Sequence, residues 1–335
     1  MPTVLDVAKR AGVAPITVSR VINNSGYISL ATRERVEAAV KELGYVPNTI
    51  ARGLRSKRTH TLALVVTDIT NPYFTSMARG VEDVAGECNY TVIYCNTDES
   101  EAKEEKYANM LAQRQVDGVL LVPSCGNENT IKFLRSNDID VVVLDRHISG
   151  VETDIVCTDS KNAANYLIKL LIGLGHKRIA IITGQKEVST SVDRVTGYQQ
   201  ALAEAGLSDN ELVFYGAFNE QSGYELTKQV MMHSPKPTAI FGANNFIAIG
   251  IIKALRDLNI DVPADVSVVG FDDLPEYMFI KPFLTVAKQP AYEMGRLAAD
   301  LLLKRISGEL SEEYQEIVLP IEIIERESSA PNKNG

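Results

Sequence analysis

Tryptophan is absent from this sequence of 335 residues, and the residues that most often bind metals or form disulfides are few. Its four cysteines form no C-x-x-C pair, and its four histidines are scattered without metal-ligand spacing. These absences argue against a zinc site and a disulfide framework, so we expect no metal and no cofactor. No run of about 18 apolar residues occurs and no signal peptide opens the sequence, which predicts a soluble cytoplasmic protein without a membrane partner.

Motifs of nucleotide binding and catalysis are also missing. The sequence has no G-x-x-x-x-G-K-[ST] loop and no G-x-G-x-x-G after a strand, so bound nucleotide phosphates are not expected. It has no G-x-S-x-G elbow and no arrangement that pairs a nucleophile with a base. We therefore predict that the protein is not an enzyme and has no catalytic residue.

The charge is unevenly distributed along the chain. The net charge of −9, taken alone, argues against nucleic acid as a partner. Residues 1–60 nevertheless carry a net charge of +6, whereas residues 61–335 carry −15. A basic N-terminal module on an acidic body is typical of nucleic-acid-binding proteins, although a solvated charged face is equally compatible with this pattern.

Residues 1–45 have the pattern of three short helices. The first has an apolar face and stops at Gly12, and the second opens near Pro15, whose fixed φ suits a first helical turn. The third is expected to run from about Thr32, as its N-cap, to the stop signal Gly44. The predicted apolar face of the first helix consists of Leu5, Val7, Ala8 and Ala11.

The spacing within this segment fits a helix-turn-helix. Ala8 is small where the two helices cross, Gly12 tolerates a positive φ four positions later, and Val18 is an apolar anchor on the second helix. Such a second helix lies in the major groove with its N-terminal residues at the base edges, and Arg20 can contact a guanine or a phosphate. An ordinary helical hairpin is the alternative.

After Thr61, short β-rich runs alternate with longer amphipathic helices. This alternation predicts parallel sheets covered on both faces, and we expect two doubly wound lobes with a binding cleft at the carboxyl ends of their strands. The predicted strands are Leu62–Val66, Thr91–Cys95, Gly118–Val122, Val141–Leu144, Arg178–Ile182, Leu212–Tyr215, Ala239–Phe241 and Val266–Gly270. The predicted helices lie near residues 76–88, 101–115, 128–136, 161–174, 194–205, 222–232, 246–258 and 290–306.

These patterns predict an α/β protein with an N-terminal all-α helix-turn-helix domain and a two-lobed, doubly wound parallel-sheet body. The helix-turn-helix domain is expected at residues 1–45, a linker at 46–60 and the body at 61–330. Within the body, we expect an N-lobe at about 61–159 plus 291–320 and a C-lobe at about 160–290 plus 321–330.

The run D-V-A-x-x-A-G-V-x-x-x-T-V-S-R-V-I-N that begins at Asp6 resembles the N-terminal signature of the lactose/galactose-repressor (LacI/GalR) family. Further matching segments follow in order through essentially the whole chain. The resemblance implies a DNA-binding domain, a hinge, and an effector-binding body like that of periplasmic sugar-binding proteins. The further segments are Thr32-Arg33, Leu43–Tyr45, Pro47-Asn48, Ala51–Leu54, Asp68–Phe74, Val116–Gly118, Gly175-His176, Gly197-Tyr198 and Val269–Asp273.

The resemblance implies that Pro15, Ile16 and Arg20 read bases. Pro15 and Ile16 lack side-chain donors, so apolar contact, for instance with a thymine methyl group, is the mode available to them. Ala14 departs from the family, which usually places a capping Ser there, and such a loss costs on the order of 1 kcal/mol. The predicted DNA-binding residues are Pro15, Ile16, Thr17, Ser19, Arg20, Asn23, Ala51, Leu54 and Arg55.

The linker at residues 46–60 has two interpretations. An isolated helix as short as the one predicted at Ala51–Arg55 is marginal in water, which favours a flexible basic linker. The resemblance implies instead a hinge helix that orders on DNA, pairs with its dimer mate and wedges Leu54 into the minor groove. Gly53 lowers helix propensity by about 1 kcal/mol relative to Ala, which makes ordering more dependent on DNA.

Aromatic, charged and amide side chains follow several predicted strands. This mixture suits a sugar, because aromatic rings stack on its apolar faces while its hydroxyls need both donors and acceptors. Their types and order, above all Asp145-Arg146, resemble the sites of ribose-binding proteins and ribose-operon repressors. Asn245 departs from the Asp of most relatives. The predicted effector-binding residues are Asn71, Tyr73, Phe74, Asp145, Arg146, Arg194, Phe218, Asn244, Asp272 and Gln289.

We therefore predict a dimeric transcriptional repressor that binds a pseudo-palindromic double-stranded DNA operator and is controlled by a pentose or related sugar. A homodimer is the default, because the polar tail Glu325–Gly335 lacks a leucine heptad. A purine corepressor, or a phosphocarrier protein bound on a lobe surface, is an alternative controller. A cytoplasmic sugar-binding protein without DNA function is the alternative of a different class.

Overall fold

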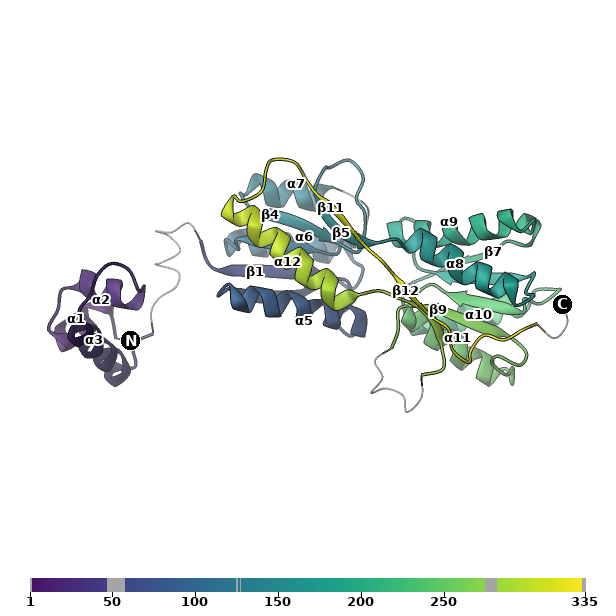
Figure 1. Ribbon diagram of the computed structural model, residues 1–335, viewed down its shortest axis with the longest axis horizontal. Coiled ribbons are helices and arrows are strands. Elements are labelled where there is room, and N and C mark those ends of the chain that lie inside the picture. The colour runs from purple at the N-terminus through teal and green to yellow at the C-terminus, as the bar shows by residue number, and fades with distance from the viewer. Residues whose placement is uncertain (1, 47–57, 125, 127, 275–281, 333–335) are drawn as a thin grey trace. The chain divides into compact units, whose positions relative to one another are not determined.

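The computed structural model describes residues 2–46, 58–124, 126, 128–274 and 282–332. The chain divides into two compact units, Met1–Thr59 and His60–Gly335 (Figure 1). Among the helices of these described ranges, none is long and apolar enough to cross a membrane.

Three helices pack around a small core in residues 2–46: α1 (Val4–Ala11), α2 (Pro15–Ile22) and α3 (Leu30–Leu43). Gly12 ends α1 in the left-handed conformation, with φ of 64°, and turns the chain towards α2. The buried core consists of Val7, Ala8, Ala11, Val18, Val21, Val36, Ala39 and Tyr45.

Two details of this unit differ from the sequence-based expectation. Leu5 is 67% exposed rather than buried, because at 100° per residue it lies beside the stripe formed by the buried residues of α1. Helix α3 begins at Leu30 with Ser29 at the N-cap, so Thr32 lies inside the first turn and is not the cap. The predicted stop at Gly44 is confirmed, with a φ of 59°.

The N-lobe is built on a six-stranded sheet in the order β11-β5-β4-β3-β1-β2, in which all neighbours run parallel. Helices α5 and α12 cover one face, and α6 and α7 cover the other, so most of its strands are buried (Figure 1). The strands are β1 (Thr61–Val66), β2 (Thr91–Asn96), β3 (Gly118–Leu121), β4 (Asp140–Leu144), β5 (Asp154–Thr158) and β11 (Glu316–Leu319). The helices are α5 (Pro72–Glu87), α6 (Glu101–Gln113), α7 (Asn129–Ser136) and α12 (Ala291–Ser307).

The C-lobe repeats this plan with a six-stranded sheet in the order β12-β10-β9-β8-β6-β7. Helices α8 and α9 cover one face, and α10 and α11 cover the other. The strands are β6 (Ile179–Thr183), β7 (Leu212–Tyr215), β8 (Ala239–Gly242), β9 (Ser267–Phe271), β10 (Thr285–Lys288) and β12 (Glu322–Ile324). The helices are α8 (Ser160–Gly173), α9 (Ser189–Glu204), α10 (Glu220–Val230), α11 (Asn245–Asp257) and the short η1 (Ser208–Asn210).

The chain passes between the two lobes where β5 leads to α8, where β10 leads to α12, and where β11 leads to β12. These passages involve the strands that the sequence pattern did not predict, namely β5, β10, β11 and β12. The eight predicted strands and eight predicted helices of the body all occur, with their ends shifted by at most five residues. The C-lobe sheet is not wholly parallel, because the edge strand β12 pairs antiparallel with β10.

Glycines allow the covering helices to approach in pairs. A Cβ on Gly295 of α12 would lie 2.0 Å from the backbone oxygen of Met77 in α5, and a Cβ on Gly80 would lie 2.1 Å from a backbone oxygen of α12. A Cβ on Gly197 would likewise lie 2.1 Å from a backbone oxygen of α8, and a Cβ on Gly250 would lie 2.1 Å from a backbone oxygen of α10. Any larger residue at these positions forces the helices apart.

We expect Gly295→Ala to lower the free energy of unfolding by about 1–3 kcal/mol, since the added methyl group meets backbone that cannot move without repacking the lobe. Gly86→Ala in α5 is the matched control, because its Cβ meets nothing within 4 Å. Alanine there should leave the stability unchanged or raise it by up to about 1 kcal/mol. Urea unfolding followed by circular dichroism measures both. Equal stability of the two variants would contradict the tight helix contact.

Candidate DNA-binding and effector sites

Helix α2 presents a largely exposed surface at its N-terminal end. The first residue, Pro15, follows Ala14, which occupies the N-cap without a side-chain hydrogen bond, as expected from the missing Ser. Ile16 is 56% exposed although it is apolar, whereas Val18 one half-turn later is fully buried. Of the predicted DNA-binding residues in this unit, Thr17 and Ser19 are half-buried, and the exposed ones are Pro15, Ile16, Arg20 and Asn23.

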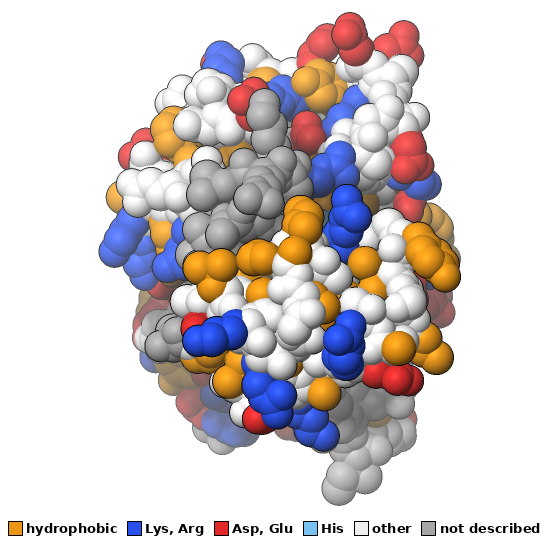
Figure 2. All heavy atoms as spheres, turned by 90° about the vertical axis from the view of Figure 1, so that its left-hand side faces the viewer, with side chains coloured by type: hydrophobic (Ala, Val, Ile, Leu, Met, Phe, Trp, Pro, Cys, Tyr) orange, Lys and Arg blue, Asp and Glu red, His pale blue; other side chains and the backbone are white. Residues whose placement is uncertain are grey.

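Several apolar side chains of the N-terminal unit are exposed, and Leu5, Ile16, Tyr27 and Leu30 are each more than half exposed. Figure 2, which looks onto the left-hand side of Figure 1, shows Lys and Arg side chains lying among exposed hydrophobic ones. Cations suit phosphate oxygens and apolar side chains suit thymine methyl groups, so such a mixed surface is compatible with DNA.

The remaining predicted DNA-binding residues, Ala51, Leu54 and Arg55, lie outside the described residues. The hinge helix and the flexible linker therefore both stay predictions.

A cavity of about 460 Å³ lies between the N-lobe and the C-lobe. Its walls come from strand ends and helix starts of both lobes, which is where doubly wound folds bind ligands. The structure brings all ten predicted effector-binding residues to this cavity: Asn71, Tyr73, Phe74, Asp145, Arg146, Arg194, Phe218, Asn244, Asp272 and Gln289.

Two buried carboxylates occupy equivalent positions in the two lobes. Asp145 follows β4 and Asp272 follows β9, and both adopt a positive φ, of 67° and 64°. The backbone N–H of each donates to the neighbouring strand, Asp145 to Val156 O at 2.9 Å and Asp272 to Ala287 O at 2.8 Å. Each lobe therefore places a buried carboxylate at the carboxyl end of its sheet.

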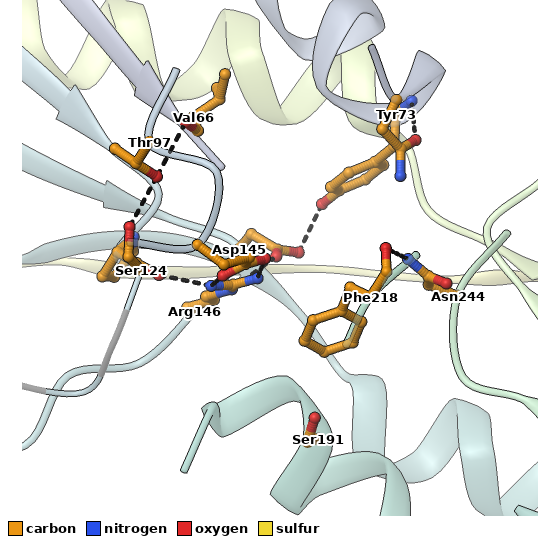
Figure 3. Close-up of polar contacts among 12 residues, drawn as sticks. Val66, Tyr73, Thr97, Ser124, Asp145, Arg146, Ser191, Phe218 and Asn244 are labelled. Atoms are coloured by element: carbon orange, nitrogen blue, oxygen red, sulfur yellow. Dashed lines mark hydrogen bonds and ion pairs between the residues drawn. The ribbon is translucent and has the colours of Figure 1, made fainter. Parts of the chain in front are cut away.

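Burial is the largest influence on the pKa values of two side chains in this cavity, Asp272 and Tyr73. Burial raises the pKa of Asp272 to about 6, although the charge of Arg194 and a 2.7 Å hydrogen bond from Gln289 Nε2 act in the opposite direction. Burial, together with the charges of Asp145 and Asp272, raises the pKa of Tyr73 well above its ordinary value. The Tyr73 hydroxyl is therefore neutral and donates to Asp145 Oδ1 at 2.7 Å (Figure 3).

Arg146 is held in the cavity wall by a carboxylate of its own lobe. Its Nη1 and Nη2 donate to the two oxygens of Glu99 at 2.7 and 2.6 Å, and Nη1 also donates to Pro123 O at 2.7 Å. The guanidinium carbon lies 5.5 Å from the ring centre of Phe218, which belongs to the C-lobe (Figure 3). Arg146 is therefore rigidly placed where the two lobes face each other.

Several buried polar atoms of the cavity lining lack a hydrogen-bond partner. Arg194 is held by a 2.6 Å hydrogen bond to a backbone oxygen and by the ring of Phe271, whose centre lies 3.8 Å from the guanidinium carbon. Its Nε nevertheless makes no hydrogen bond, and within the described ranges the other buried cavity-lining side-chain atoms without a hydrogen-bond partner are Thr67 Oγ1, Arg146 Nε and Gln185 Oε1. Because buried polar groups are normally hydrogen-bonded, these atoms are candidates for hydrogen bonds to a bound molecule.

Asn71 and Asn245 join the lobes through a reciprocal pair of hydrogen bonds, each Nδ2 donating to the other residue's Oδ1 at 2.9 Å. Asn71 Oδ1 also accepts from the backbone N–H of Tyr73 at the start of α5. An amide at position 245 supplies both a donor and an acceptor, whereas an ionised Asp would supply acceptors only. Asn71 therefore lines the cavity while its side-chain amide is hydrogen-bonded to Asn245 of the C-lobe.

Sequence reasoning missed further residues of the lining. Several directly follow a strand that had been predicted, as Thr67 follows β1 and Asp98 lies just after β2, so the strand ends were a usable signal. The missed lining residues are Thr67, Asp68, Thr70, Asp98, Glu99, Gln185, Thr190, Ala217 and Asn219.

A helix-turn-helix unit followed by two lobes around a polar cavity defines a DNA-binding transcriptional regulator. Residues 3–48 match the family model described as bacterial regulatory proteins, lacI family, and residues 168–329 match the periplasmic binding protein-like domain. The chain is 34% identical to the ribose operon repressor of Escherichia coli, over 98% of this chain and 100% of that protein. It is 35% identical to the transcriptional repressor PurR of Aliivibrio salmonicida, over 91% and 92% of the two chains.

The solved structures agree with this assignment. The lac repressor dimer bound to operator and the anti-inducer ONPF has a TM-score of 0.85 at 26% identity, over 98% of this chain and 99% of that one. The regulator CelR in complex with cellobiose has a TM-score of 0.74 at 35% identity, over 98% and 100%. A regulator from Enterococcus faecium with bound ribose has a TM-score of 0.74 at 31% identity, over 82% and 100%. The chain belongs to the lacI family of bacterial regulatory proteins.

Proposed function

We propose that this protein is a cytoplasmic, homodimeric repressor that binds a pseudo-palindromic operator and responds to a pentose or a related sugar. The domain boundaries at residues 45, 60 and 330 form part of this proposal. Each helix α2 would read one half-site, with Pro15, Ile16 and Arg20 at the base edges. The exposed, partly apolar start of α2 supports this role.

The opposed carboxylates Asp145 and Asp272 carry the proposal of a sugar effector. A sugar offers several hydroxyl donors around one ring, and two negative acceptors from opposite lobes can each take such hydrogen bonds. The Nε atoms of Arg146 and Arg194, which have no hydrogen-bond partner, would supply donors for the ring and hydroxyl oxygens. The relatives crystallised with ribose and with cellobiose bind sugars in a similar fold, which also supports this choice.

Titration calorimetry with D-ribose, other pentoses, hexoses and hypoxanthine tests the effector. A sugar at 100-fold its dissociation constant should also raise the stability by about 2.7 kcal/mol, which thermal unfolding detects. Tight hypoxanthine binding without heat from any sugar would replace the sugar by a purine corepressor. Binding of a phosphocarrier protein without either ligand would place control on a lobe surface instead.

We expect Arg20→Ala to weaken operator binding by about 1–3 kcal/mol, because the variant loses a side chain placed to contact a base or a phosphate. Gel-shift titrations at fixed salt measure the loss. Leu54→Ala tests the predicted wedge in the same assay, and Arg256→Ala, an exposed arginine of α11 in the C-lobe, is the matched control. Unchanged operator affinity in both the Arg20 and the Leu54 variants would overturn the assignment to DNA and favour a sugar-binding protein alone.

A further inference from the structure

Three side chains with metal-binding atoms come together at the edge of the N-lobe sheet, outside the cavity lining. Cys157 lies in β5, Glu316 begins the neighbouring strand β11, and His147 follows β4. Glu316 Oε1 lies 4.0 Å from both His147 Nδ1 and Cys157 Sγ, and all three ligand atoms lie within 4.8 Å of one another.

We propose that His147, Cys157 and Glu316 form a binding site for Zn²⁺. One imidazole, one thiolate and one carboxylate are the ligand types that zinc takes in four-coordinate sites, and they leave a fourth position for water. In a tetrahedral zinc site the ligand atoms lie about 3.4–3.6 Å from one another. Small movements of the three side chains would bring their ligand atoms from the observed separations to these distances. As the Sγ–Zn bond forms, the thiol proton leaves to solvent.

The cluster combines one buried ligand, Cys157, with two solvent-accessible ones, His147 and Glu316. The side chains of His147 and Glu316 are 41% and 56% exposed, which gives a metal ion a path from solvent. Cys157 is buried, and its pKa is raised to about 12 by burial and by the carboxylates of Glu316, Asp145, Asp193 and Asp159. The same negative field that disfavours a bare thiolate attracts a divalent cation.

The site also lies at the boundary between the lobes. The backbone N–H of His147 donates to Ser189 Oγ at the start of α9 in the C-lobe at 2.9 Å. Asp193 of α9 interacts electrostatically with both His147 and Cys157. Zinc bound here would fix the segment after β4 against the N-lobe sheet next to its contact with the C-lobe. No sequence motif indicates this cluster, because His147, Cys157 and Glu316 are widely spaced and meet only through the order of the strands in the sheet.

Titration of the full-length protein with Co²⁺, after chelator and reductant are removed, tests the site without DNA or sugar. We expect a near-ultraviolet thiolate-to-cobalt charge-transfer band, intense visible bands of four-coordinate cobalt, and displacement of both by Zn²⁺. Cys157→Ser should abolish the charge-transfer band. Cys88→Ser, which changes an exposed cysteine at the end of α5, should leave it unchanged.

His147→Ala and Glu316→Gln keep the test independent of folding, because both change exposed side chains. Each should weaken Zn²⁺ binding at least about tenfold, since even the loss of an outer-shell partner typically costs 10–100-fold. The proposal is overturned if the wild-type protein shows no charge-transfer band at saturating cobalt. It is equally overturned if the band persists in Cys157→Ser or if neither exposed variant changes the zinc affinity.

Discussion

Asp145→Asn is expected to weaken sugar binding by about 10- to 150-fold, which corresponds to the 1.5–3 kcal/mol of a hydrogen bond to a charged group. The variant keeps one oxygen for the Tyr73 hydroxyl but replaces the other by an amide donor, and it removes the charge that a sugar hydroxyl would meet. Asparagine is preferred to alanine, because Asp145 has a φ of 67°, a conformation that Asn tolerates and Ala does not. Calorimetry with the best sugar of the panel measures the loss.

Asp138→Asn is the matched control for this variant. Asp138 is also an aspartate with a positive φ, of 59°, but it is exposed and does not line the cavity. Its substitution should leave sugar affinity unchanged. Full affinity in the Asp145 variant would remove that carboxylate from the effector site, and an equal loss in both variants would point to a general effect on folding.

Asp272→Asn is expected to raise the free energy of unfolding by about 2–3 kcal/mol at pH 8 while it weakens sugar binding. The carboxyl group has a pKa of about 6 in the folded protein, mainly through burial, against 3.8 as its ordinary value. Each pKa unit corresponds to about 1.4 kcal/mol, so holding this charge in the folded state costs about 3 kcal/mol above pH 6.

The pH dependence gives this prediction its sign. As the pH falls from about 6 to about 4, folded Asp272 takes up a proton that the unfolded chain does not yet bind, so the wild-type protein recovers the lost stability. Asp272→Asn cannot do so, and its advantage should vanish near pH 4. Urea unfolding at pH 8, 6 and 4.5 measures the difference, with the exposed Asp209→Asn as control. An advantage that does not depend on pH would assign the effect to packing rather than to the buried charge.

Local patterns along the chain predicted the elements better than their ends. Gly12 and Gly44 were recognised as helix stops because a left-handed cap depends on one residue and its immediate neighbours. The N-cap of α3 was placed three residues late, at Thr32 instead of Ser29, since both residues are of a type that caps helices. Strands β11 and β12 were missed because they are only three or four residues long and form through pairing with strands far away in the sequence.

The candidate effector site was also predictable in part. Residues at strand ends such as Asp145 and Asp272 could be found, because carboxyl ends of parallel strands meet at one edge. The ion pair between Glu99 and Arg146 could not be predicted, since it depends on where the loop after β2 lies relative to the end of β4.

The sequence by itself determined the helix-turn-helix, the alternation of strands and helices, and which strand ends bear polar residues, because these follow from periodicity and from neighbouring residues. Only the tertiary structure decided which distant groups meet. Asn71 and Asn245 are 174 residues apart and pair across the lobes, and His147, Cys157 and Glu316 converge through the order of β4, β5 and β11. Such contacts depend on sheet order and lobe packing, which arise from many weak interactions over the whole body rather than from any local pattern.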